Sequence, residues 1–222
     1  MLNRRLKEIK SRIRSSALKG GYDPDEVKIV AVTKNVAVER IAEALELGIT
    51  SCGENRLQEA EPKIKQLSGE IRWHFLGHLQ TNKVKSVIGL FSLIHSLDSL
   101  RLARAMEKRA TQADMDVPAL IQVNAVGEKG NYGFNPGEVE DFITEIRGGR
   151  IKIMGLMTMA PYFENAEEAR PIFRQVRELK EKIRIPGVEL EYLSMGMTND
   201  YHIAVEEGAN MVRIGTALFG AR

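Results

Sequence analysis

The stretch Val27-Lys-Ile-Val-Ala-Val-Thr-Lys34 decides the fold of this chain. Its residues from Ile29 to Val32 form a continuous apolar run, typical of a parallel strand that is buried on both faces. A lysine follows this run where such a strand meets its loop. An unpaired buried ammonium is costly, so Lys34 reaches water, finds a partner or serves chemistry, and the strand alone leaves these alternatives open.

Composition places the chain among soluble globular proteins. Of its 222 residues, 43% are hydrophobic and 28% charged, and the net charge of +2 implies no nucleic-acid partner. No apolar run approaches the ~20 residues that span a membrane. Cys52 is the only cysteine, which excludes an internal disulfide and a cysteine-rich metal site. These features predict a protein of the reducing cytoplasm.

Residues 1–19 carry apolar side chains at helical spacing, and Gly20-Gly21 follows them. This pattern predicts an N-terminal helix packed outside the main fold, with a basic, solvated outer face. We expect residues 1–222 to form a single domain that includes this helix.

A strand-then-helix rhythm begins at Val27 and continues without a linker to the end of the chain. Eight such units predict a single α/β domain, a (β/α)8 TIM-type barrel with the extra N-terminal helix. An open doubly wound sheet is the alternative. The expected strands are 27–34, 49–52, 71–76, 91–96, 117–124, 151–158, 190–194 and 210–214. The expected helices are 38–47, 56–67, 79–87, 166–182 and 200–207, with a final short turn at 217–220. Two further helices are expected, one capped by Asp98 or Ser99 and one opened by Pro136.

The functional residues of such a barrel lie at the carboxyl ends of its strands. Two of these ends predict a phosphate site. Ser194-Met-Gly-Met-Thr198 offers hydroxyls and a glycine before an expected helix, and Arg213-Ile-Gly215 precedes another short helix at Thr216. Tight turns at Gly196 and Gly215 are the alternative interpretation. The other residues at strand ends are Lys34, Asn55, His74 with Gly77, His95 with Ser96, Asn124 and Met157 with Thr158.

A lysine at one strand end and a phosphate site at two others predict a phosphorylated carbonyl ligand held as a Schiff base. Pyridoxal 5′-phosphate (PLP) fits this description, and a sugar phosphate fits nearly as well. The acid nearest a strand end is Glu54, which serves equally well to open the next helix. Arg213 is therefore a candidate to face the pyridine nitrogen, where it would keep that nitrogen unprotonated and weaken the cofactor as an electron sink.

The histidines do not predict a metal site. His78, His95 and His202 lack the mutual spacing of metal ligands, so we expect no bound metal. His74 stands beside Trp73 and Phe75 and suits a hydrogen-bonded core position as well as a cofactor contact.

Short motifs from residue 31 to the end of the chain resemble the YggS/PROSC family of PLP homeostasis proteins, whose fold is that of the N-terminal barrel of alanine racemase. The motifs are Ala31-Val-Thr-Lys34, Gly53-Glu-Asn-Arg56 with Gln58-Glu59, Trp73-His-Phe-Leu-Gly77 with Leu79-Gln80 and Asn82-Lys83, Gly155-Leu-Met157, Ser194-Met-Gly-Met197 with Asp200, and Val212-Arg-Ile-Gly215 with Phe219-Gly220.

The resemblance implies a cytoplasmic protein that binds, buffers and delivers PLP and so maintains vitamin B6 and amino- and keto-acid pools. We expect a monomer without robust catalysis, with apo PLP-dependent enzymes as recipients. Thr198 stands where the family often has serine, and Asn131, beside Lys129, where many members have lysine. The implied roles are a Schiff base on Lys34, a phosphate held by Ser194, Gly196, Met197, Thr198 and Gly215, a pyridine nitrogen faced by Arg213, and a ring flanked by Asn55, Met157 and His74.

Two enzymatic functions remain as alternatives. A weak PLP-dependent amino acid racemase needs a second base, for which Tyr132, Tyr162 and Tyr201 are candidates. Alanine racemases take that tyrosine from a C-terminal domain and a partner subunit, and this chain ends at Arg222, so we expect inefficient racemization. A phosphosugar aldolase or isomerase generally places an acid near its lysine, and the first strand offers none.

Overall fold

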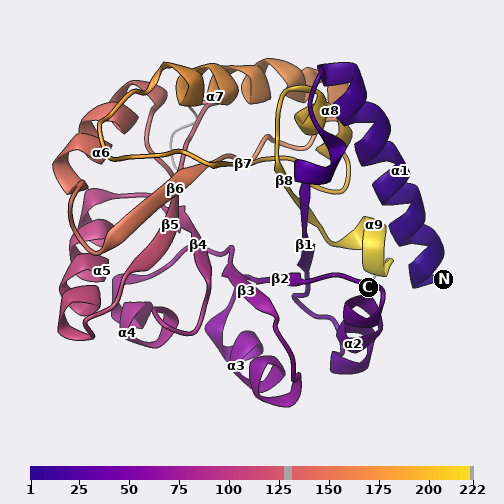
Figure 1. Ribbon diagram of the computed structural model, residues 1–222, viewed down its shortest axis with the longest axis horizontal. Coiled ribbons are helices and arrows are strands. Elements are labelled where there is room, and N and C mark those ends of the chain that lie inside the picture. The colour runs from indigo at the N-terminus through magenta and orange to yellow at the C-terminus, as the bar shows by residue number, and fades with distance from the viewer. Residues whose placement is uncertain (128–131, 221–222) are drawn as a thin grey trace.

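Eight parallel strands close a barrel in the order of the sequence, β1 to β8, with helices around its outside (Figure 1). This computed structural model describes residues 1–127 and 132–220 and confirms the predicted TIM-type barrel. The strands are β1 (Lys28–Val32), β2 (Ser51–Glu54), β3 (Arg72–Phe75), β4 (Leu93–Leu97), β5 (Val117–Gln122), β6 (Ile151–Met157), β7 (Tyr192–Ser194) and β8 (Met211–Ile214).

The helices follow the strands in turn, as the predicted rhythm requires. Ser99 is the N-cap before the helix that follows β4, and its side chain accepts a hydrogen bond from the Leu102 amide. The helical segments are α1 (Leu2–Gly20), η1 (Pro24–Glu26), α2 (Val38–Glu46), α3 (Leu57–Gln66), η2 (Thr81–Lys83), α4 (Val84–Val87), α5 (Leu100–Gln112), η3 (Pro136–Glu138), α6 (Val139–Ile146), η4 (Ala166–Ala169), α7 (Arg170–Lys182), α8 (Tyr201–Glu206) and α9 (Thr216–Phe219).

The alternation of side chains along each strand divides the core into two layers. Val30 faces the barrel interior, where it packs with Leu93, Leu120, Met157 and Met211. Its neighbour Ala31 belongs to the larger layer between the barrel and the helices. The apolar run of β1 thus reflects a strand with apolar contacts on both faces, as the sequence indicated.

The N-terminal helix lies outside the helix ring, against α8 and α9 (Figure 1). Its inner face is apolar: Leu2, Leu6, Ile9 and Ile13 are buried. Gly21 ends the helix in the left-handed conformation, with φ of 80°, which glycine adopts without strain. The predicted helix over residues 1–19 is therefore confirmed.

Most expected elements differ from the structure by one or two residues at their ends, and two of the differences bear on the site. The second strand is Ser51–Glu54 and not 49–52, so Gly53 and Glu54 belong to the strand. The expected helix 79–87 is only the short η2 and α4, because Val84–Val87 makes a single α-helical turn before the chain leaves it at Ile88. Among the described residues no helix has both the length and the apolar character that crossing a membrane requires.

Candidate functional site

The end of β1 is a tight turn that carries Lys34. The strand itself ends at Val32, and Thr33 extends its ladder with a hydrogen bond from its amide to the Gly53 carbonyl, 2.9 Å. The Val36 amide then donates to the Thr33 carbonyl at 3.0 Å, and Asn35 takes a φ of 55°. Lys34 is thus the first central residue of the turn, and it is exposed. Of the alternatives that the sequence left open, Lys34 is therefore exposed to water and is not buried with a partner.

Asn55 follows β2 and is half-buried beside the turn that follows β3. The two loops pack backbone to backbone at Gly77, where an added Cβ would collide with the Asn55 carbonyl oxygen. Glycine at 77 is therefore what allows the ends of β2 and β3 to meet.

We expect Gly77→Ala to lower the free energy of unfolding by about 3 kcal/mol, because the new methyl group forces two loop backbones apart. Gly137→Ala is the matched control, since a Cβ at Gly137 would meet nothing within 4 Å. Urea unfolding of both variants tests this prediction. Equal midpoints for the two variants would contradict it.

The loops after β7 and β8 face each other across a short span. The Ala217 amide donates to Thr198 Oγ1 at 3.2 Å and so ties the two loops together. Gly196 has a φ of 90°, and a Cβ there would strike Tyr201 and Ala204 of α8. We name Gly196, Met197, Thr198, Gly215 and Thr216 the cradle. These are backbone positions and hydroxyls of the kind that hold a phosphate.

The helix expected over 200–207 is present beside the cradle. Helix α8 starts at Tyr201, and the carboxylate of its N-cap residue Asp200 accepts the Met197 amide hydrogen at 2.6 Å. Burial raises the pKa of Asp200, although the Met197 amide opposes the shift. The expected short helix at Thr216 is present as α9, with Gly215 at its N-cap.

A cavity of about 380 Å³ opens beside the cradle. Its walls come from the loop after β6 and the loops after β7 and β8, and it includes Met197, Thr198, Asp200 and Thr216. A second cavity of about 380 Å³, lined by Gln122, Asn124 and Tyr132 among others, shares Ala160, Pro161 and Met197 with the first. Together they give the mouth of the barrel room for a small ligand.

Below the mouth, a chain of buried polar side chains crosses the barrel interior. Arg213 donates through Nη1 to Ser194 Oγ at 2.7 Å and to the Ser194 carbonyl at 2.8 Å, and through Nη2 to the Thr158 carbonyl at 2.8 Å. Ser194 Oγ contacts His95 Nδ1 at 3.1 Å, and His95 Nε2 contacts His74 Nδ1 at 2.9 Å. The network fixes the Arg213 guanidinium from below.

Burial sets the charge states in this network. It lowers the pKa of His74 to about 4, with help from the positive charges of Arg72 and Lys28. Burial is the main cause that holds the pKa of His95 well below its ordinary value, and the nearby His74 and Arg213 lower it further. The pKa of Arg213 falls to about 10, again through burial, which leaves the guanidinium charged at neutral pH. The network therefore contains one cation and two neutral imidazoles.

The free energy of unfolding should fall by about 2 kcal/mol between about pH 7 and pH 5 through His74 alone. The unfolded imidazole titrates at 6.5 and the folded one at about 4, so stability is complete above 6.5 and is lost as the pH falls toward 4. Urea unfolding at both pH values, for the wild type and His74→Gln, measures the difference. An equal loss in both proteins would contradict this account.

Of the predicted cofactor-binding residues, Met197 and Thr198 line the two mouth cavities, and the others, such as Lys34, Asn55 and Met157, do not. Met157 is buried in the barrel interior with Val30 and Leu93. Glu54 points outward from β2 to α3, where Lys63 Nζ contacts its Oε1 at 2.7 Å. The nearest strand-end acid thus neither opens the helix after β2 nor joins the cavities, because Gly53 faces the interior and its neighbour must face the helices.

The three candidate tyrosines separate in the structure. Tyr132 stacks on His78 with ring centroids 3.8 Å apart, and His78 Nδ1 contacts the Asp98 carboxylate at 2.7 Å. Tyr162 is 80% exposed and lines the cavity at the cradle. Tyr201 is buried, and Arg12 of α1 lies over its ring at 5.8 Å, away from the mouth.

Some expectations concern groups that the structure does not test. Lys129 and Asn131 lie outside the described residues. Within residues 1–127 and 132–220, no group of three or more His, Cys, Asp and Glu side chains is arranged to hold a metal ion. Cys52 is buried, and burial raises the pKa of its thiol to about 12.

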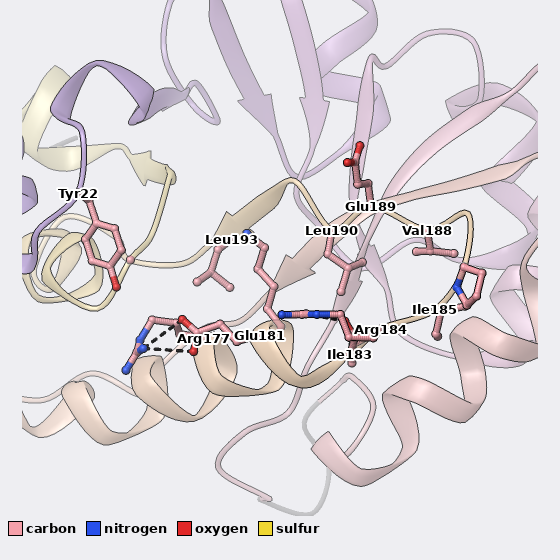
Figure 2. Close-up of a pocket in the computed structure, with 13 residues that line it drawn as sticks. Tyr22, Arg177, Glu181, Ile183, Arg184, Ile185, Val188, Glu189, Leu190 and Leu193 are labelled. Carbon is pink, nitrogen blue, oxygen red and sulfur yellow. Dashed lines mark hydrogen bonds and ion pairs between the residues drawn. The ribbon is translucent and has the colours of Figure 1, made fainter.

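A cavity larger than the two at the mouth lies at the other end of the barrel, near the amino end of β7. It measures about 640 Å³ and is lined from α7, the chain before β7, Tyr22 and Gly208. Figure 2 shows its Arg177–Glu181 ion pair and the side chains of Leu190 and Leu193. Ligand sites of this barrel type lie at the carboxyl ends of the strands, so we assign the site to the mouth in spite of this cavity's greater size.

Sequence reasoning missed the link between His95, Thr158 and Arg213. Leu93 and His95 are two residues apart in β4, so their side chains point to the same face of the strand, and the sequence contained this signal. Only the closed barrel, however, brings β4 opposite β7 and β8. Asp200 was noted within a motif, and its contact with the Met197 amide was not predicted.

Comparison with known proteins gives consistent matches over the whole chain. Residues 5–222 match the family described as alanine racemase, N-terminal domain. The pyridoxal phosphate homeostasis protein of Aquifex aeolicus is 42% identical, over 98% of this chain and 97% of that protein. PipY of Synechococcus elongatus PCC7942, solved without PLP, superposes with a TM-score of 0.88 at 32% identity, over 99% of this chain and 100% of PipY. With PLP bound, PipY gives 0.84 at 33% identity and the same coverage.

Proposed function

The chain belongs to the alanine racemase N-terminal domain family, among its pyridoxal phosphate homeostasis proteins, and from this premise we propose that it binds PLP at the mouth of the barrel. Lys34 holds the cofactor as a Schiff base. The protein carries and buffers PLP, keeps the vitamin B6 and amino- and keto-acid pools in balance, and has no robust catalytic turnover.

The observation that carries this proposal is the pairing of a water-accessible lysine with a two-loop phosphate cradle at the same end of one barrel. Lys34 stands at the end of β1, and β1 pairs directly with β8, whose following residues Gly215 and Thr216 belong to the cradle. The hydrogen bond from Ala217 to Thr198 fixes the two cradle loops together. An aldehyde and a phosphate on one small molecule match these groups.

Arg213 supports a carrier more than a catalyst. Three of its five N–H groups already have acceptors at Ser194 and Thr158, so the guanidinium is fixed and charged under the mouth. Bound PLP supplies an aldehyde for amines and a pyridine ring that accepts electrons when its nitrogen is protonated. A cationic donor at that nitrogen leaves it unprotonated, and Glu54, which would have the opposite effect, points to α3.

Titration with PLP and with pyridoxal tests the role of the cradle. We expect PLP to bind at least about tenfold more tightly, because only PLP carries the phosphate, and inorganic phosphate to compete with it. Equal affinities for the two aldehydes would show that the cradle does not hold a phosphate. Absorbance of the Schiff base and equilibrium dialysis provide the two measurements.

The carrier role predicts delivery to apo PLP-dependent enzymes in the cytoplasm by a monomer. The protein loaded with PLP should reactivate an apo enzyme in the presence of a phosphatase that destroys free PLP. Free PLP at the same concentration is the control and should fail under these conditions. Light scattering of the loaded protein measures whether it is a monomer.

One observation favours the alternative of a weak amino acid racemase. Asp98 orients the His78 imidazole, and Tyr132 stacks on the same ring, which places two proton-carrying groups in the loops at the mouth. Exchange of the substrate α-hydrogen in deuterated water distinguishes the two functions. A rate above that of free PLP that falls in Tyr132→Phe supports the racemase, and the rate of free PLP supports the carrier.

A further inference from the structure

Beneath the Lys34 turn lies a buried ion pair that the proposed function does not use. Glu54 of β2 is fully buried, and the Lys63 side chain from α3 is 11% exposed. Lys63 Nζ contacts Glu54 Oε1 at 2.7 Å and donates to the Thr33 carbonyl, also at 2.7 Å. The pair therefore holds the backbone of the residue that directly precedes Lys34.

The same turn is held by two further contacts. The Thr33 hydroxyl donates to Glu54 Oε1 at 2.6 Å, so the side chain of Thr33 is fixed as well as its carbonyl. The Asn35 amide donates to Glu59 Oε2 at 3.2 Å. Glu59 and Lys63 are four residues apart, which places both on one face of α3, under the residues on each side of Lys34.

Stability alone does not account for this pair. A buried ion pair is often no more stabilising than apolar side chains of similar volume, because both charges lose their hydration. Glu54 Oε2 is also buried and has no hydrogen-bond partner among the described residues. An arrangement that carries such a cost is more easily explained by the geometry that it imposes on the turn.

We infer that Glu54 and Lys63 are positioning residues for Lys34, which fix the Thr33–Val36 turn so that the Lys34 amine is presented to the mouth of the barrel. This inference rests on the proposed function. When Lys34 condenses with an aldehyde, a C=N bond forms between its nitrogen and the aldehyde carbon, and the aldehyde oxygen leaves as water with the two hydrogens of the neutral amine. A fixed turn raises the rate of this step by holding the amine in a productive orientation.

The experiment compares the rate of Schiff-base formation with PLP in Lys63→Met, Lys63→Arg and the double variant Glu54→Gln/Lys63→Met. The control is Lys65→Met, an exposed lysine on the same helix. We expect the rate to fall about tenfold or more in the double variant, to return toward the wild-type value in Lys63→Arg, which keeps a donor for Thr33, and to be unchanged in the control. Because the double variant leaves no unpaired buried charge, it keeps the comparison possible if Lys63→Met does not fold.

Thermal unfolding of each variant separates positioning from stability. A slow rate at a temperature where the double variant is fully folded supports the inference. A wild-type rate in the folded double variant overturns it while the proposed function stands. A wild type that forms no adduct on Lys34 overturns both.

Discussion

Lys34→Ala is expected to abolish the covalent link to PLP and to weaken PLP binding at least about tenfold. The wild type should show an absorbance band near the visible edge that borohydride removes, because a Schiff base is reduced to a stable amine. The variant should show only the spectrum of free aldehyde. Lys34 is exposed in a turn and packs no core, so this substitution should leave the unfolding curve unchanged.

Lys83→Ala provides the matched control for that experiment. Lys83 is also exposed and belongs to η2, in the connection that follows β3. We expect its band and its affinity for PLP to equal those of the wild type. A Lys34→Ala protein that keeps the band, or binds PLP as tightly as the control, would contradict the assignment.

Arg213→Gln is expected to lower the free energy of unfolding by about 3 kcal/mol or more. The guanidinium makes three hydrogen bonds in a buried position, and its loss leaves buried acceptors at Ser194 and Thr158 without their donor. Arg213 also holds the carbonyl and the hydroxyl of Ser194, which is the last residue of β7 before the loop that follows it. PLP affinity should therefore fall with stability.

Arg101→Gln is the control, because Arg101 is exposed on α5. Urea unfolding and PLP titration of both variants give the comparison. If Arg213→Gln unfolds at the same urea concentration as Arg101→Gln, the buried network does not stabilise the barrel as described. Lost PLP binding at unchanged stability would assign Arg213 to the cofactor alone.

The sequence was enough for the barrel and for the ends of its strands to within two residues. The double-sided apolar run of β1, the strand–helix rhythm and the Ser99 cap are local signals, and the structure agrees with each. The glycines at 196 and 215 also lie in loops, as predicted. These features depend on neighbours in the chain, which a pattern of residues describes well.

What the sequence could not provide depends on which face of a strand a side chain occupies. The second strand ends two residues later than expected, and this register places Glu54 against α3 with Lys63. His95 and Arg213 meet Ser194 only because the barrel closes β4, β7 and β8 around one interior. A one-residue change in register moves a side chain to the other face, so such contacts require coordinates.

If Lys34 holds PLP at the mouth of the barrel, borohydride reduction of the loaded wild-type protein attaches the cofactor permanently to this lysine, and mass spectrometry of the modified peptide locates it. We expect one phosphopyridoxyl group per chain, on Lys34. A label on Lys63, Lys83 or Lys180 in place of Lys34, or no label from protein saturated with PLP, would contradict it.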